Sequence, residues 1–92
     1  MTEATLQRAI QKAIRDRGGK VIKIHGNAYA QAGTPDLIGV LAGVSFAIEV
    51  KRPGETATKL QAHELEQWGL QGWAVGVATS VDDAIGIIQG DN

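Results

Sequence analysis

Two acidic residues and a lysine stand at the ends of two apolar runs in this chain. Asp36 follows Pro35 at the start of the first run, and Glu49 and Lys51 close the second. Side chains alternate between the two faces of an extended strand, so Glu49 and Lys51 share one face, about 7 Å apart along the strand. The spacing therefore predicts a carboxylate and an ammonium group side by side at the end of a strand.

A turn between the two runs brings the acids together. If Asp36 begins one strand and the chain turns at residues 41–43, the next strand runs antiparallel to the first. Asp36 then lies near Glu49, because directly paired residues are about 5 Å apart. Two close carboxylates repel each other unless a cation lies between them, and oxygen ligands suit a hard ion. The pattern predicts a site for Mg2+ (or Mn2+).

The motif residues resemble those of a known nuclease family. Pro35-Asp36 followed by Glu49-Val50-Lys51 resembles the PD-(D/E)xK signature of metal-dependent nucleases. The fuller string resembles the virus-type replication-repair nuclease (VRR-NUC) domain in its stand-alone phage and bacterial form, over roughly the whole chain. That string is Gly33-Thr-Pro-Asp-Leu-Ile, Phe46-Ala-Ile-Glu-Val-Lys-Arg-Pro-Gly and Thr58-Lys-Leu-Gln61. The resemblance implies one nuclease domain over residues 1–92, with a restriction-endonuclease-like core.

The resemblance also implies a set of metal ligands. Asp36 and Glu49 would bind the ion directly, the Val50 carbonyl would be a further ligand, and Glu3 would supply an acid from the first helix. From the residues alone, Glu3 is equally well interpreted as a favourable charge in a helix first turn. Glu49 with Lys51 also has a purely structural interpretation, as an ion pair beside a Pro-Asp turn.

Two further residues complete the predicted catalytic set. Lys51 would orient the nucleophilic water or stabilise the transition state of phosphodiester hydrolysis. Gln61 is a polar side chain on the stripe of its helix that faces the core, and buried polar groups need a hydrogen-bond partner. The resemblance gives Gln61 a supporting role at the active site. The alternative is an ordinary hydrogen bond to backbone.

Charge is unevenly distributed along the chain. Residues 1–52 carry eight Lys or Arg against four acids, a balance of +4, whereas residues 53–92 carry one lysine against six acids, a balance of −5. The basic half contains the motif, and phosphate binding depends on a local basic patch rather than on net charge. Arg8, Lys12 and Arg15 line one helix face and could contact a phosphate backbone, but their pattern favours an ordinary solvated surface. The candidate DNA-binding residues are Arg8, Lys12, Arg15, Lys23 and Arg52.

Composition excludes several other classes of protein. The 92 residues make one domain with a thin core, which favours self-association. The chain has no cysteine, which excludes a disulfide scaffold and a thiolate metal site. Neither a Walker loop nor GxGxxG occurs, so no nucleotide cofactor is expected. Without a long apolar run or a signal-like amino terminus, the chain is expected to be soluble and cytoplasmic, in a bacterial or phage-infected cell, with no membrane partner.

Periodicity and caps predict the order α-β-β-β-α-β-α, an α/β fold with a mixed sheet flanked by helices. Val44, Phe46, Ile48 and Val50 share the core face of one strand, and Leu60, Leu65 and Trp68 with Trp73 are further core candidates. The last strand is an almost unbroken apolar run, which predicts that it is buried on both faces. The elements are a helix from Thr2 to Gly18-Gly19, strands at 20–25, from Asp36 to the turn and at 44–51, a helix from Thr56 or Thr58 to about Gly72, a strand at 73–79 and a helix capped by Ser80.

The resemblance, taken with these features, implies a metal-dependent, structure-selective DNA endonuclease that hydrolyses phosphodiester bonds, and we expect it to act at four-way (Holliday) or other branched junctions. So small a chain has little surface for reading a base sequence, which favours recognition of DNA shape. A two-fold homodimer would cut the two strands of a junction at related positions. The alternatives are a catalytically silent nucleic-acid binder and a regulatory or assembly module with the same fold, in which the charges are structural.

Overall fold

A computed structural model describes residues 1–25 and 31–90 of the chain. Its element order confirms the predicted α-β-β-β-α-β-α arrangement. The first strand ends two residues earlier than predicted, and residues 26–30 of the predicted loop lie outside the described residues. The elements are α1 (Glu3–Asp16), β1 (Lys20–Lys23), β2 (Leu37–Leu41), β3 (Val44–Val50), α2 (Lys59–Leu70), β4 (Ala74–Ala78) and α3 (Val81–Gln89).

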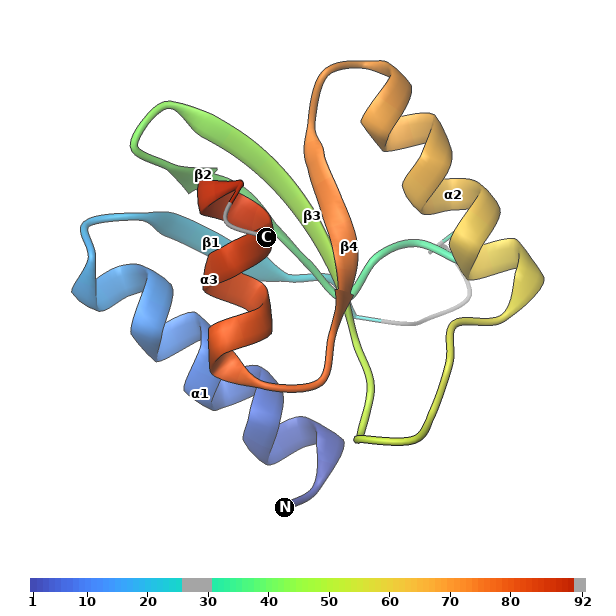
Figure 1. Ribbon diagram of the computed structural model, residues 1–92, viewed down its shortest axis with the longest axis horizontal. Coiled ribbons are helices and arrows are strands. Elements are labelled where there is room, and N and C mark those ends of the chain that lie inside the picture. Colours follow the sequence, from blue (N-terminus) through green and yellow to red (C-terminus); the bar gives the residue numbers. More distant parts are fainter. Residues whose placement is uncertain (26–30, 91–92) are drawn as a thin grey trace.

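The four strands form one mixed sheet in the order β1-β2-β3-β4. The first three strands are antiparallel, and β4 runs parallel to β3 after the crossover through α2. α1 and α3 pack side by side, whereas α2 lies apart from them beside β4 (Figure 1). Neighbouring residues of β4 point to opposite faces: a Cβ on Gly76 would meet Ile87 of α3, and a Cβ on Gly69 of α2 would meet Val75. The predicted sheet with helices on both faces is therefore confirmed.

The hydrophobic core lies between the sheet and the layer formed by α1 and α3. Phe46, Ile48 and Val50 of β3 are fully buried, as their alternation in the sequence predicts. The helices contribute, among others, Ile10, Ile14, Ala84 and Ile88. On the other face, α2 has a single buried residue, Leu65. Most of the core is thus on one face of the sheet. Among the described helices, α2 covers the face of β3 that carries Glu49.

Several predicted core residues are less buried than expected because of where they lie in the folded structure. Val44 is 37% exposed because it adjoins the hairpin turn, and Leu60 is 48% exposed at the start of α2. Trp68 and Trp73 are half-buried and pack edge to face, with ring centroids 4.6 Å apart. In β4 only Ala78 is fully buried. Helices lie on both faces of this strand, but its place at the sheet edge leaves the rest half-buried.

A two-residue hairpin turn sets the register of β2 against β3. Ala42 and Gly43 have positive φ values of 51° and 80°, the combination found in tight hairpins. Leu41 consequently pairs with Val44, and the ladder continues to Leu37 opposite Ile48. One further step places Asp36 opposite Glu49. The predicted turn and its consequence for the acids are confirmed.

Each helix begins at a predicted cap. Thr2 accepts a hydrogen bond from the Thr5 amide, and Ser80 accepts one from the Asp83 amide. Of the two candidates for α2, Thr58 is the cap. No helix in the described part of the chain is long and apolar enough to cross a membrane.

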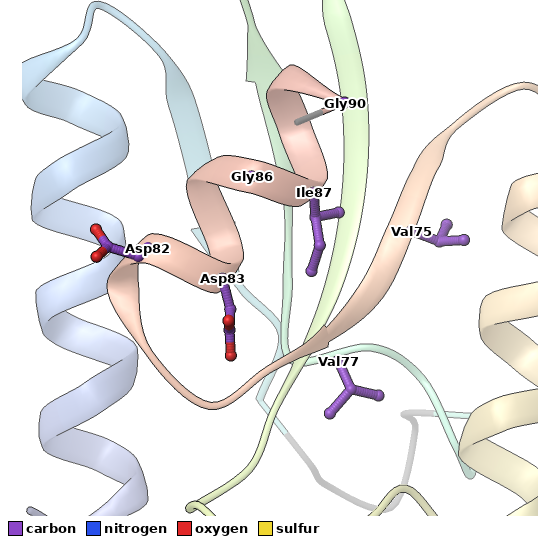
Figure 2. Close-up of a pocket in the computed structure, with 7 residues that line it drawn as sticks. All are labelled: Val75, Val77, Asp82, Asp83, Gly86, Ile87 and Gly90. Atoms are coloured by element: carbon purple, nitrogen blue, oxygen red, sulfur yellow. The ribbon is translucent and has the colours of Figure 1, made fainter. Parts of the chain in front are cut away.

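A hollow of about 450 Å³ lies along β4 and α3, away from the motif (Figure 2). Val75 and Val77 line it from the strand, and Ile87 lines it from the helix with Asp82 and Asp83 at one end. None of the predicted catalytic or metal-binding residues borders it. This hollow is therefore separate from the predicted site at the end of β3.

Candidate active site

Glu49 is the buried centre of the predicted site. It lies near the end of β3 on the face covered by α2 and is only 2% exposed. Its Oε1 accepts a hydrogen bond from Gln61 Nε2 at 3.1 Å. Its Oε2 is buried and has no hydrogen-bond partner among the described residues. A buried carboxylate oxygen without a donor is costly, so this atom is suited to a ligand that the protein itself does not supply.

Asp36 lies directly across the ladder from Glu49. Pro35 before it is fully buried, and the Asp36 carbonyl accepts a hydrogen bond from the Ile24 amide at 2.8 Å. Its Oδ2 accepts a hydrogen bond from the Val50 amide at 2.9 Å. The N–H and C=O of one strand residue point to the same side, so the Val50 carbonyl lies on the side of β3 that faces Asp36.

Burial and the neighbouring Asp36 carboxyl group both affect the protonation of Glu49. The pKa of Glu49 is raised to about 8, mainly by burial and then by the adjacent Asp36 carboxyl group, whereas the Lys51 charge acts to lower it. Without another cation nearby, Glu49 is therefore largely protonated at neutral pH.

Lys51 and Glu3 lie within electrostatic reach of Glu49. Lys51 is half-buried and lowers the pKa of Glu49, as expected for a positive charge on the same face of β3. Its backbone amide donates to the Ala78 carbonyl at 3.0 Å, which fixes the end of β3 against β4. Glu3, in the first turn of α1, is half-buried and raises the pKa of Glu49. The structure thus brings Asp36, Glu49, Lys51 and Glu3 toward one another.

Gln61 connects Glu49 to the first turn of α2. Its Oε1 accepts from the Thr58 amide at 2.9 Å, and its own amide donates to Thr58 Oγ1 at 3.1 Å. These two bonds form a capping box, a reciprocal arrangement that begins many helices. The sequence predicts a polar Gln61 facing inward, but not that the same side chain caps the helix and holds the carboxylate.

The predicted DNA-binding residues do not form one cluster with the carboxylates. Arg8 bonds Thr5, Lys12 pairs with Asp16 at 2.6 Å, and Arg15 bonds Gln11 and the Val21 carbonyl. All three belong to α1, on the opposite face of the sheet from α2. Lys23 is exposed on β1, and Arg52 pairs with Glu55 at 2.7 Å just after Lys51. Arg52 is thus the one closest in sequence to the site, and the DNA contacts stay predictions.

Gly33, which the sequence marks only as part of the motif, packs against α2. Its φ is +82°, and a Cβ at this position would lie 2.8 Å from Leu60 Cγ and 3.1 Å from the Leu60 carbonyl oxygen. The first turn of α2 therefore contacts the segment before Asp36 as well as Glu49. A glycine in the sequence does not by itself reveal such a contact, because five other glycines with positive φ occur in the described residues.

Gly33→Ala is expected to destabilise the protein by more than about 2 kcal/mol, since about 1–2 kcal/mol of left-handed strain adds to the overlap with Leu60. Gly72→Ala is the matched control, because its φ is +91° but no atom lies within 4 Å of the added Cβ. Urea unfolding of both variants measures the difference. Equal losses would contradict a tight contact between Gly33 and α2.

The donor set fits a hard divalent cation. Asp36 supplies a carboxylate, Glu49 supplies a buried oxygen without a partner, and the Val50 carbonyl lies on the same side of β3. Oxygen donors of this kind suit Mg2+ or Mn2+. Across residues 1–25 and 31–90, no three His, Cys, Asp or Glu side chains are close enough to surround one ion. Glu3 as an additional ligand therefore stays a prediction.

Solved structures with similar folds agree with the resemblance in the sequence. A VRR_NUC domain superposes with a TM-score of 0.78 at 26% identity, covering 98% of this chain and 97% of its own. A second VRR_NUC domain protein superposes with a TM-score of 0.75 at 22% identity, covering 98% and 87%. Hjc, a Holliday junction resolvase of the archaeal hyperthermophile Archaeoglobus fulgidus, has the same fold, with a TM-score of 0.66 at 20% identity and coverage of 82% and 65%.

The match to a family model covers most of the chain. Among curated proteins, no sequence matches this chain with significance. The model of the archaeal Holliday junction resolvase (Hjc) matches residues 3–79, which include Asp36, Glu49, Lys51 and Gln61. The chain therefore belongs to the archaeal Holliday junction resolvase (Hjc) family, a family of PD-(D/E)xK nucleases.

Proposed function

We propose that residues 1–92 form one nuclease domain, a Mg2+-dependent endonuclease that cuts four-way or other branched DNA junctions as a homodimer. The observation that carries this proposal is the pair Asp36 and Glu49, with a buried Glu49 oxygen that has no partner. Membership of a resolvase family supports the substrate, and Lys51 beside the pair supports hydrolysis. A silent binding module would need no such unpartnered buried carboxylate.

Different residues of the chain have different roles in the proposed hydrolysis. Asp36, Glu49 and the Val50 carbonyl would hold the cation, with Glu3 as a further candidate ligand. A Mg2+ ion held by these residues would supply a water of lowered pKa and a positive charge beside the scissile phosphate. Gln61 keeps Glu49 in place by its hydrogen bond of 3.1 Å. Lys51 orients the attacking water or stabilises the negative charge that develops on the phosphate oxygens.

DNA binding is assigned to the basic half of the chain. Arg52 follows Lys51 and would contact a phosphate next to the cut, while Lys23 is exposed on β1. Arg8, Lys12 and Arg15 on α1 would contact the backbone farther from the cut. A single small domain has few side chains for reading bases, so we infer that the shape of the junction is recognised. Two sites related by a two-fold axis would cut opposed strands of the junction.

A cleavage assay on a panel of labelled DNA structures tests substrate and metal together. We expect Mg2+ or Mn2+ to support cutting of a four-way junction in preference to flap, splayed arm, duplex and single strand. Ca2+ should allow binding with little cutting, because it tolerates looser geometry and more ligands. Full activity in Ca2+ or in EDTA would contradict the proposed site. Binding without any cutting would favour the silent module.

Sedimentation of the protein with a four-way junction tests the dimer separately. Two chains for each junction are expected, with paired cuts on opposed strands. If only one chain bound and only single cuts appeared, symmetric resolution would be excluded. Cutting of single strands or flaps would remain compatible with the same catalytic residues.

A further inference from the structure

The first turn of α2 contacts both halves of the proposed metal site. Gln61 donates to Glu49, and the Leu60 backbone lies against Gly33, three residues before Asp36. The position of this turn therefore influences the placement of both carboxylates. The turn itself is held by its cap, Thr58, whose Oγ1 accepts the Gln61 amide at 3.1 Å.

The capping box decides which way the Gln61 side-chain amide faces. The Thr58 amide donates to Gln61 Oε1 at 2.9 Å, which leaves the Nε2 end to face Glu49. Reversing this amide would place an oxygen against the Glu49 carboxyl oxygen and an N–H group against the Thr58 N–H. The contact between the two N–H groups would be repulsive in every state, and the contact between the two oxygens would be repulsive when Glu49 is ionised, as it must be to bind a cation. The orientation in which Gln61 holds Glu49 thus depends on where the cap holds the Thr58 backbone.

We propose that Thr58 is a positioning residue for the active site, acting through Gln61. Its hydroxyl fixes the first turn of α2, the turn fixes the orientation of the Gln61 amide, and the amide occupies Glu49 Oε1. This leaves Oε2, which has no partner, for the cation. The inference rests on the proposed nuclease function for its catalytic consequence, but the link from Thr58 to Gln61 is independent of catalysis.

Nuclear magnetic resonance of the Gln61 side-chain amide tests the link directly. In the wild type, one Nε2 proton bonds Glu49, so the two protons should have well-separated shifts and slow exchange with water. Thr58→Val, which keeps the shape but removes the hydroxyl, should move both shifts toward those of an exposed glutamine. Thr58→Ser should retain the wild-type pattern because it restores the acceptor.

Cleavage kinetics test the consequence for catalysis. Thr58→Val is expected to lower kcat about tenfold, with KM for DNA unchanged. Substitution of residues that hold metal ligands in place typically lowers activity about 10- to 100-fold, and Thr58 acts one step further away, through Gln61. Thr58→Ser should restore kcat to near the wild-type value. The matched control is Ser80→Ala, which likewise removes a capping hydroxyl group, in this case the one at the start of α3. It should lower the thermal midpoint by a similar amount but leave kcat and the Gln61 amide unaffected.

Each outcome either supports or overturns the proposal. A Thr58→Val protein that keeps both the Gln61 amide pattern and kcat would overturn it. An equal loss of kcat in Ser80→Ala would also overturn it, because the effect would then reflect stability alone. If the wild type cut no DNA, the proposed function would fail. The amide measurements would still decide whether Thr58 orients Gln61.

Discussion

Lys51→Met is expected to lower the rate of junction cleavage about 100- to 1000-fold, the usual cost of removing one charged group that stabilises a transition state. Lys51 is half-buried and its charge acts on Glu49, so it is placed where negative charge develops. Methionine keeps the length and the apolar stem of lysine. DNA binding and, at saturating concentration, metal binding should persist, because the proposed ligands Asp36 and Glu49 are intact.

The control for this substitution is Lys59→Met. Lys59 is an exposed lysine in the first turn of α2, so the control removes an equal charge from the neighbouring element. Rapid-quench cleavage at saturating protein compares the chemical step in the two variants. Unchanged turnover in Lys51→Met would remove Lys51 from the mechanism. Equal losses in both variants would assign the effect to general attraction of DNA.

The metal-free protein is expected to lose stability as the pH rises from about 5 to 9. The pKa of Glu49 is raised from 4.5 to about 8 in the folded protein, mainly by burial and then by Asp36. Between these values the folded state binds a proton that the unfolded state has released, so the free energy of unfolding falls with increasing pH. The loss is on the order of a few kcal/mol and is complete above the folded pKa.

Urea unfolding in EDTA at several pH values measures this loss. Glu49→Gln is the matched control, because its side chain is neutral at every pH and keeps the size of protonated glutamate. Its stability should depend much less on pH between 5 and 9. Affinity for Mn2+ should increase with pH below 8 in the wild type, since the ion displaces the proton. A wild-type curve that parallels Glu49→Gln would contradict a buried, protonated Glu49.

The part of the site that the sequence predicts well is the part fixed by local structure. Alternation along β3 places Glu49 and Lys51 on one face, and the two-residue turn at Ala42-Gly43 sets Asp36 opposite Glu49. Both features depend on residues close together in the chain. The caps Thr2 and Ser80 are predictable for the same reason.

The part that the sequence does not predict depends on how the elements pack. From the sequence, Thr56 and Thr58 are equal candidates for the N-cap of α2. The capping box between Thr58 and Gln61 in the structure distinguishes them. Leu60 has the spacing of a core residue but lies exposed, because α2 buries only Leu65 against the sheet. The apolar sequence of β4 is typical of a central strand. Only the order of the strands in the sheet identifies β4 as an edge strand.

Direct titration with Mn2+, followed by the paramagnetic signal of the free ion, measures whether Asp36 and Glu49 bind a divalent cation. The wild type is expected to bind Mn2+ at pH 8, and Asp36→Asn is expected to lose most of this binding. Thermal unfolding would confirm that the variant is folded. If the wild type bound no Mn2+, or if Asp36→Asn bound it equally well, Asp36 and Glu49 would not form the metal centre of this protein.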